Sequence, residues 1–122
     1  MIYLYSDLTQ KIIGAAIKVH KTLGPGFPEK IYQRALSEEF NKQRIPFIRE
    51  EKFRVYYENK DVGYEIMDFC AYDKIAIELK AMREIMDLHA KQVVSYLKGR
   101  KLRLGLILNF GKSKLEIKRV IL

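Results

Sequence analysis

The stretch IAIELKAM, residues 75–82, decides how the rest of the chain is interpreted. Its residues alternate with the two-residue period of a β-strand, so isoleucine and leucine lie on one face while Ala76, Glu78 and Lys80 lie on the other. A carboxylate and an ammonium thus project from the most strand-like segment of the chain. The spacing Glu-x-Lys alone favours a solvated cross-strand ion pair, whereas the apolar surroundings favour a polar site built on the sheet.

Helical patterns lie on both sides of this stretch. Apolar residues at helical spacing predict three helices, over residues 7–23, 28–43 and 83–99. Asp7 is expected to cap the first helix and Gly99 to end the third. The buried side of the second helix is expected to include Ile31, and that of the third either Leu88 or His89.

Extended patterns fill the remaining segments. Alternating apolar residues predict five strands, at residues 52–57, 64–72, 75–81, 102–110 and 114–122. The resulting order is ααβββαββ, an α/β (mixed α+β) fold in which helices flank a mixed central sheet. We expect residues 1–122 to form a single domain, because the chain contains no linker, repeat or low-complexity segment.

Composition indicates an anionic partner. The 122 residues include 23 Lys and Arg against 15 Asp and Glu, a formal charge of +8. A surface of this sign attracts polyanions, so nucleic acid is the first partner to consider, although many small basic proteins bind nothing specific. Size alone suggests a homodimer, because so small a body offers little surface for holding a long duplex.

The single cysteine, Cys70, excludes an internal disulfide and a cysteine-based zinc site, which favours a reducing cytoplasm. No apolar run approaches the roughly 20 residues that cross a bilayer, so no membrane partner is expected. The N-terminal segment also lacks the features of a signal peptide.

The turn between the second and third strands decides which side chains meet. A three-residue loop at residues 72–74 pairs Ala71 with Ile75 and therefore Asp68 with Glu78, and Lys80 then lies on the same face. A two-residue loop turns the Asp68 carboxylate to the other face. The sequence leaves both loop lengths open.

Two facing carboxylates would repel each other, and their burial without a cation would raise at least one pKa. A divalent cation relieves this repulsion. Mg²⁺ prefers one or two carboxylates together with water and phosphate oxygens, which Asp68 and Glu78 could provide. Lys80 could then hold an attacking water or stabilise charge on a phosphate.

Further motifs give these residues a family resemblance. Asp on one strand and Glu-x-Lys on the next resemble the signature of the PD-(D/E)xK nuclease superfamily, whose core has the order αβββαβ and a restriction-endonuclease-like fold. The segment GFPEKIY, residues 26–32, fits Gly-x-x-Glu-x-x-Tyr and resembles the GxxExxY protein family. Later segments that resemble the same family are IELKAM, QVVSYLKG and GLILNFG, so the resemblance covers nearly the whole chain.

The resemblance implies roles for the acidic residues and the lysine. Glu29 is implied to be the acidic residue of the helix before the sheet, and Lys80 the catalytic lysine. The implied ligands of Mg²⁺ or Mn²⁺ are Asp68, Glu78 and the backbone carbonyl of Leu79. Together these residues imply a metal-dependent nuclease that hydrolyses DNA phosphodiester bonds.

The third predicted helix also carries a motif of this superfamily. Gln92 and Tyr96 match the Gln-x-x-x-Tyr pattern of its RecB-like branch, where the motif lies near the active site. Residues four apart share one face of a helix, so the geometry agrees with a shared role. Tyr32 and His89 are expected to be packing residues.

Two other classes of function remain open. The chain could be a catalytically inactive nucleic-acid-binding module of the same fold, in which case salt-sensitive binding would persist without metal binding. It could also be a protein-interaction domain that uses the edge of its last strand, residues 114–122. Metal binding separates the nuclease from both alternatives.

Overall fold

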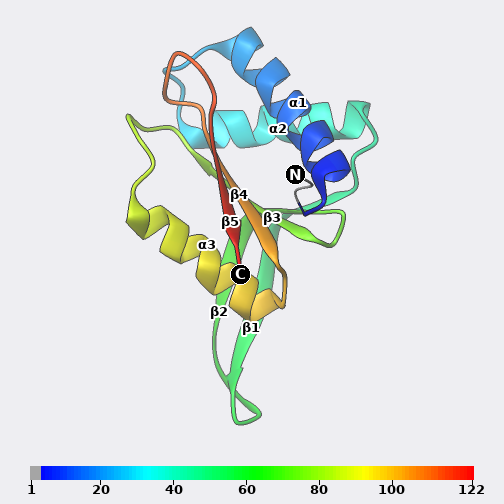
Figure 1. The fold of residues 1–122 in the computed structure, drawn as a ribbon, viewed down its shortest axis with the longest axis vertical. Coiled ribbons are helices and arrows are strands. Elements are labelled where there is room, and N and C mark those ends of the chain that lie inside the picture. The colour runs from blue at the N-terminus through cyan, green and yellow to red at the C-terminus, as the bar shows by residue number, and fades with distance from the viewer. Residues whose placement is uncertain (1–3) are drawn as a thin grey trace.

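The computed structural model describes residues 4–122 (Figure 1). Its order of elements confirms the predicted ααβββαββ. The elements are α1 (Ser6–Leu23), α2 (Glu29–Lys42), β1 (Phe47–Tyr57), β2 (Lys60–Ala71), β3 (Ile75–Lys80), α3 (Asp87–Arg100), β4 (Leu104–Asn109) and β5 (Glu116–Ile121). None of the helices in the described part of the chain has the length and apolar character needed to cross a membrane.

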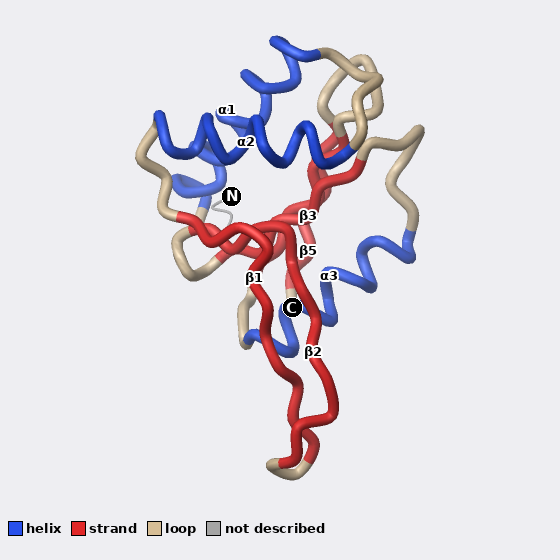
Figure 2. Tube along the Cα trace, turned by 180° about the vertical axis from the view of Figure 1, so that it is seen from behind, coloured by secondary structure: helices blue, strands red, loops and turns tan. Residues whose placement is uncertain are grey.

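The five strands form one mixed sheet with the spatial order β1-β2-β3-β4-β5. Neighbouring strands are antiparallel except for β3 and β4, which are parallel and joined through α3. Helices α1 and α2 lie on one side of the sheet and α3 on the other (Figures 1 and 2). This is the layered arrangement expected of an α/β fold.

Strand β3 contributes to two separate cores. Ile75, Ile77 and Leu79 are fully buried in the core beneath α1 and α2. Ala76 belongs to the smaller core beneath α3. Glu78 and Lys80, which alternate with the first set, therefore lie on the α3 side of the strand.

Of the two loop lengths left open by the sequence, the turn between β2 and β3 has the three-residue one. Ala71 pairs with Ile75, and the ladder continues to the pair of Phe69 and Ile77. Tyr72 and Asp73 both adopt a left-handed backbone conformation, with φ of 57° and 55°. This register brings Asp68 opposite Glu78, immediately beyond the last paired residues.

Several expected boundaries and burials were wrong. Asp7 lies inside α1, whose N-cap is Tyr5, and Ile31 on α2 is exposed. Helix α3 begins at Asp87 and continues through Gly99 to Arg100. Of the two alternatives on α3, His89 is buried whereas Leu88 is 70% exposed.

Gly99 lies within α3 because of packing and not because the helix ends there. A Cβ atom at this position would lie only 2.5 Å from Cε2 of Phe53 on β1. The glycine thus lets the last turn of α3 approach the β1–β2 hairpin closely. Lys101 ends the helix instead, in the left-handed conformation that commonly follows a helix.

Candidate active site

Three carboxylates from three different elements meet at one end of β3. Glu29 begins α2, Asp68 lies on β2 and Glu78 lies on β3. One carboxylate oxygen from each residue lies within 4.8 Å of the other two. Glu29 is exposed, Asp68 is half-buried and Glu78 is buried, so the cluster extends from solvent into the protein. We call these three residues the carboxylate cluster.

Glu78 is the most perturbed member of the cluster. Burial raises its pKa from 4.5 to about 8, and the negative charges of Asp68 and Glu29 act in the same direction, while the Lys80 ammonium opposes them. The Glu78 Oε2 atom lies 3.4 Å from Lys80 Nζ. The buried Oε1 atom has no hydrogen-bond partner. An unpartnered buried carboxylate oxygen is unfavourable unless a cation occupies the position in front of it.

The other two carboxylates are perturbed in the same direction. Burial raises the pKa of Asp68, although the Leu79 N–H, which donates to Asp68 Oδ2 at 2.8 Å, and the Lys80 charge both lower it. Glu29 is the most exposed of the three, but partial desolvation by the surrounding protein, followed by the charge of Asp68, still raises its pKa. The predicted consequence of facing carboxylates is thereby confirmed, since the pKa of every member of the cluster is raised.

A chain of hydrogen bonds connects Lys80 to α3. Lys80 Nζ donates to Oε1 of Gln92 at 3.3 Å, and Gln92 Nε2 donates to the Tyr96 hydroxyl at 2.8 Å. Burial and the charges of Glu78 and Asp68 raise the pKa of Tyr96, which therefore stays a neutral hydroxyl. The structure thus brings Gln92 of the Gln-x-x-x-Tyr motif to the lysine and places Tyr96 at the Gln92 amide.

Gln33 was missed by the sequence interpretation. Its side chain is buried, and its Nε2 atom donates to Asp68 Oδ1 at 3.4 Å while its Oε1 atom accepts from Lys30 Nζ at 3.2 Å. The signal was its position four residues after Glu29, which places both side chains on one face of α2. Gln33 orients Asp68 from the helix that carries Glu29.

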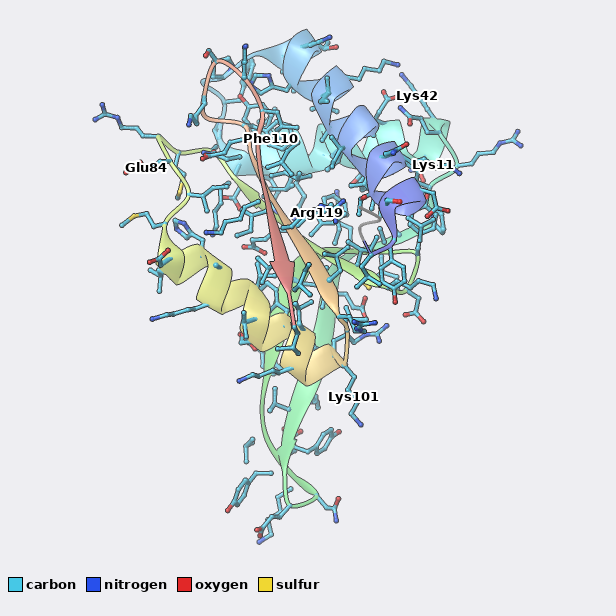
Figure 3. The ribbon with its side chains drawn as sticks, viewed as in Figure 1. Lys11, Lys42, Glu84, Lys101, Phe110 and Arg119 are labelled. Atoms are coloured by element: carbon cyan, nitrogen blue, oxygen red, sulfur yellow. The ribbon has the colours of Figure 1, made fainter. Side chains whose placement is uncertain are left out.

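The tyrosine of the Gly-x-x-Glu-x-x-Tyr segment has a structural position. The Tyr32 hydroxyl donates to the Gly24 carbonyl at 2.5 Å and accepts from the Phe27 N–H at 3.2 Å. Its ring stacks on Phe110, whose centroid is 4.7 Å away and which lies beside the first turns of α2 (Figure 3). Tyr32 therefore ties down the loop that determines where α2, and with it Glu29, begins.

His89 also has a structural role. Its Nδ1 atom accepts a hydrogen bond from the Met86 N–H at 2.9 Å, which satisfies a free donor at the start of α3. The imidazole is buried and lies outside the carboxylate cluster. The expectation that His89 packs and does not ligate agrees with this contact.

The carboxylate cluster opens into a hollow of about 510 Å³. The hollow is lined by Glu29, Lys30, Gln33, Glu50, Ile66 and Asp68. Substrate atoms entering it would meet the exposed side of the cluster, while Glu78 and Lys80 lie behind. An oxygen-only set of this kind suits a hard divalent cation such as Mg²⁺ or Mn²⁺ and suits zinc poorly.

Comparison with known proteins gives one match. The family model described as the PD-(D/E)XK nuclease superfamily matches residues 6–120. No curated protein and no solved structure gives a significant match.

Proposed function

The chain belongs to the PD-(D/E)XK nuclease superfamily, and from this membership we propose that it is a Mg²⁺- or Mn²⁺-dependent nuclease that hydrolyses phosphodiester bonds of DNA. One observation carries the proposal: three carboxylates with raised pKa values converge beside a lysine, and the buried Oε1 atom of Glu78 lacks a partner. Such a cluster is costly for folding by itself, and a bound cation offsets this cost.

In the proposed site, the metal ligands are Asp68, Glu78 and the Leu79 carbonyl, and Glu29 completes the acidic set. A bound divalent cation would polarise the scissile phosphate and lower the pKa of a water molecule. Gln33 and the Leu79 N–H hold the Asp68 carboxylate in place. The chain's own residues thus supply a preorganised oxygen cage.

Lys80 acts directly on the reacting groups. Its ammonium lies between the Glu78 carboxylate and the Gln92 amide, so it is held at the cluster. From there it orients the attacking water or stabilises the negative charge that grows on the phosphate. Gln92 and Tyr96 act through Lys80 as positioning residues.

The distribution of charge supports a nucleic-acid substrate. Residues 80–122 carry eleven Lys and Arg against three Asp and Glu, whereas residues 1–79 carry twelve of each. The whole net charge therefore belongs to Lys80 at the end of β3 and to α3, β4, β5 and their loops. Phosphate contacts from this part of the chain would make binding fall steeply with salt.

Cleavage of plasmid, linear and branched DNA in Mg²⁺ or Mn²⁺ tests the proposal. We expect Asp68→Asn, Glu78→Gln and Lys80→Ala each to lower the rate by at least ~100-fold, the usual effect of removing a group that stabilises transition-state charge. Glu38→Gln is the matched control, because Glu38 is exposed on α2 outside the cluster. Equal cleavage by wild type and by Asp68→Asn would overturn the assignment.

Calorimetric titration with Mn²⁺ separates the nuclease from its inactive alternative without measuring activity. We expect wild-type protein to bind the ion and Glu78→Gln to bind it more weakly. DNA binding without any metal binding would identify an inactive module instead. Loss of both kinds of binding would leave a protein-interaction domain, for which β5 is available at the edge of the sheet.

We place the chain in the GxxExxY family, supported by residues 26–32, and in the RecB-like branch, supported by the Gln92 and Tyr96 contacts. We further propose a single domain over residues 1–122, a cytoplasmic location and a homodimer. Light scattering coupled to size-exclusion chromatography tests the homodimer.

A further inference from the structure

The β1–β2 hairpin projects beyond the rest of the sheet (Figures 1 and 2). It leaves large apolar side chains in solvent, among them Tyr64, which is 54% exposed, and Ile66, which is 48% exposed. Apolar groups gathered on one element in this way mark a contact surface. The carboxylate cluster uses neither side chain as a ligand.

Two cations share the face of the hairpin that carries these side chains. Arg54 pairs with Tyr64 across the strands, and Lys52 pairs with Ile66. Lys52 Nζ lies 4.1 Å from the centroid of the Tyr64 ring, and Arg54 Cζ lies 5.8 Å from it. Phe53, which alternates with them on β1, packs against α3 instead, so the four residues face away from α3. We call these four residues the hairpin strip.

The hairpin strip is continuous with the carboxylate cluster. Ile66 lines the same hollow as Glu29 and Asp68, and Tyr64 lies two residues farther along β2. A ligand that leaves the hollow along β2 would therefore pass over Ile66 and then over the Tyr64 ring.

The charged groups of the strip remain available to an anion. Lys52 makes no ion pair with a carboxylate among residues 4–122. Arg54 pairs with Asp61 at 2.8 Å, but both side chains are exposed, and an exposed pair of this kind exchanges readily for a phosphate. Alternating aromatic, aliphatic and cationic side chains are the components of surfaces that bind single-stranded nucleic acid.

We propose that the hairpin strip binds a single-stranded segment of nucleic acid that leads into the carboxylate cluster. The inference rests on the proposed function, since it supplies the substrate class for that site. One base stacks on Tyr64 and its neighbour packs against Ile66, while Lys52 and Arg54 contact the phosphates. A duplex hides the faces of its bases, so the strip distinguishes unpaired from paired strands.

Fluorescence anisotropy of a labelled single-stranded oligonucleotide tests the inference, with a chelator present so that neither cleavage nor metal binding contributes. We expect Tyr64→Ala to weaken binding by about 5- to 150-fold, the effect of losing one stacked base, and Tyr64→Phe to bind like wild type. Tyr57→Ala is the matched control. Tyr57 is 65% exposed on the same hairpin, but it alternates to the face of Phe53.

Equal losses in Tyr64→Ala and Tyr57→Ala would overturn the inference. So would a blunt duplex that binds as tightly as the single strand and loses as much affinity in Tyr64→Ala. Metal-dependent cleavage that is unchanged in Tyr64→Ala would refute the role of the hairpin strip but would leave the proposed nuclease function intact. A Tyr64 effect on single-strand binding without any cleavage would support the strip and refute the nuclease.

Discussion

Removal of the buried charge at Glu78 provides a direct physical test of the site. The Glu78→Gln variant keeps the size and shape of the side chain but cannot ionise. In the wild-type protein the pKa of Glu78 is raised from 4.5 to about 8, so the folded state binds a proton more tightly than the unfolded state does. Wild-type stability contributed by this group is therefore present at low pH and decreases as the pH rises from about 4.5 to about 8.

The size of this stability difference follows from the two pKa values of Glu78. One pKa unit is worth about 1.4 kcal/mol, so a rise from 4.5 to about 8 corresponds to at most about 5 kcal/mol. Water can enter from the adjoining hollow and Lys80 can move toward the carboxylate, so we expect about 2 kcal/mol to be observed. Glu78→Gln should match the wild type at about pH 4 and exceed its free energy of unfolding by this amount at about pH 9.

Urea denaturation in the presence of a chelator at several pH values measures the difference. The control is Glu39→Gln, whose side chain is about as buried but whose pKa is lowered, first by the Gln43 hydrogen bond and then by Lys18. That variant should be destabilised at neutral and high pH, and the loss should disappear as the pH falls below about 4.5. The explanation is refuted if Glu78→Gln is no more stable than wild type at high pH. When Mg²⁺ replaces the chelator, the wild type should become more stable than Glu78→Gln, because the ion stabilises only the wild type.

Three further predictions concern the scaffold around the site and are read by urea denaturation. Tyr32→Phe should lose about 1 kcal/mol, because the hydroxyl no longer donates to Gly24, and an unchanged free energy of unfolding would contradict this. Gly99→Ala should lose about 1 to 3 kcal/mol, since its Cβ would overlap Phe53, and Phe53→Leu in the same protein should recover part of the loss. Asn109→Ala should lose about 2 to 4 kcal/mol, because the side-chain oxygen of Asn109 accepts from two backbone N–H groups in the loops after β3 and β4, and an unchanged free energy of unfolding would contradict this.

The local patterns predicted the elements well because the two faces of an element lie in different surroundings, which leaves a periodic signal in the sequence. Helix α1 buries one face in the core beneath α1 and α2, whereas β3 places its large aliphatic residues in that core and Ala76 in the core beneath α3. The ends of elements were less predictable. Gly99 looks like a helix terminator, but it is a contact with Phe53 from a strand more than forty positions earlier.

The residues of the candidate site were also only partly predictable from the sequence. Asp68, Glu78 and Lys80 could be proposed from strand period and turn length, because the register of a hairpin is a local property. The spacing from Glu29 places Gln33 on the same face of α2, but its contact with Asp68 was not predictable, since it depends on how α2 lies against the sheet. The hairpin strip was also missed, because its four residues form a surface only after β1 and β2 pair and project from the sheet.

Residue types and their periods determine the order of elements, the two faces of β3 and the excess of positive charge, because these depend on neighbours in the chain. The tertiary structure decides that Glu29 joins Asp68 and Glu78, that Gln92 reaches Lys80 and that the hollow opens toward Ile66. These contacts join residues from separate elements, whose relative positions follow from the packing of both cores. The raised pKa values have the same origin, since burial and the proximity of like charges exist only in the folded chain.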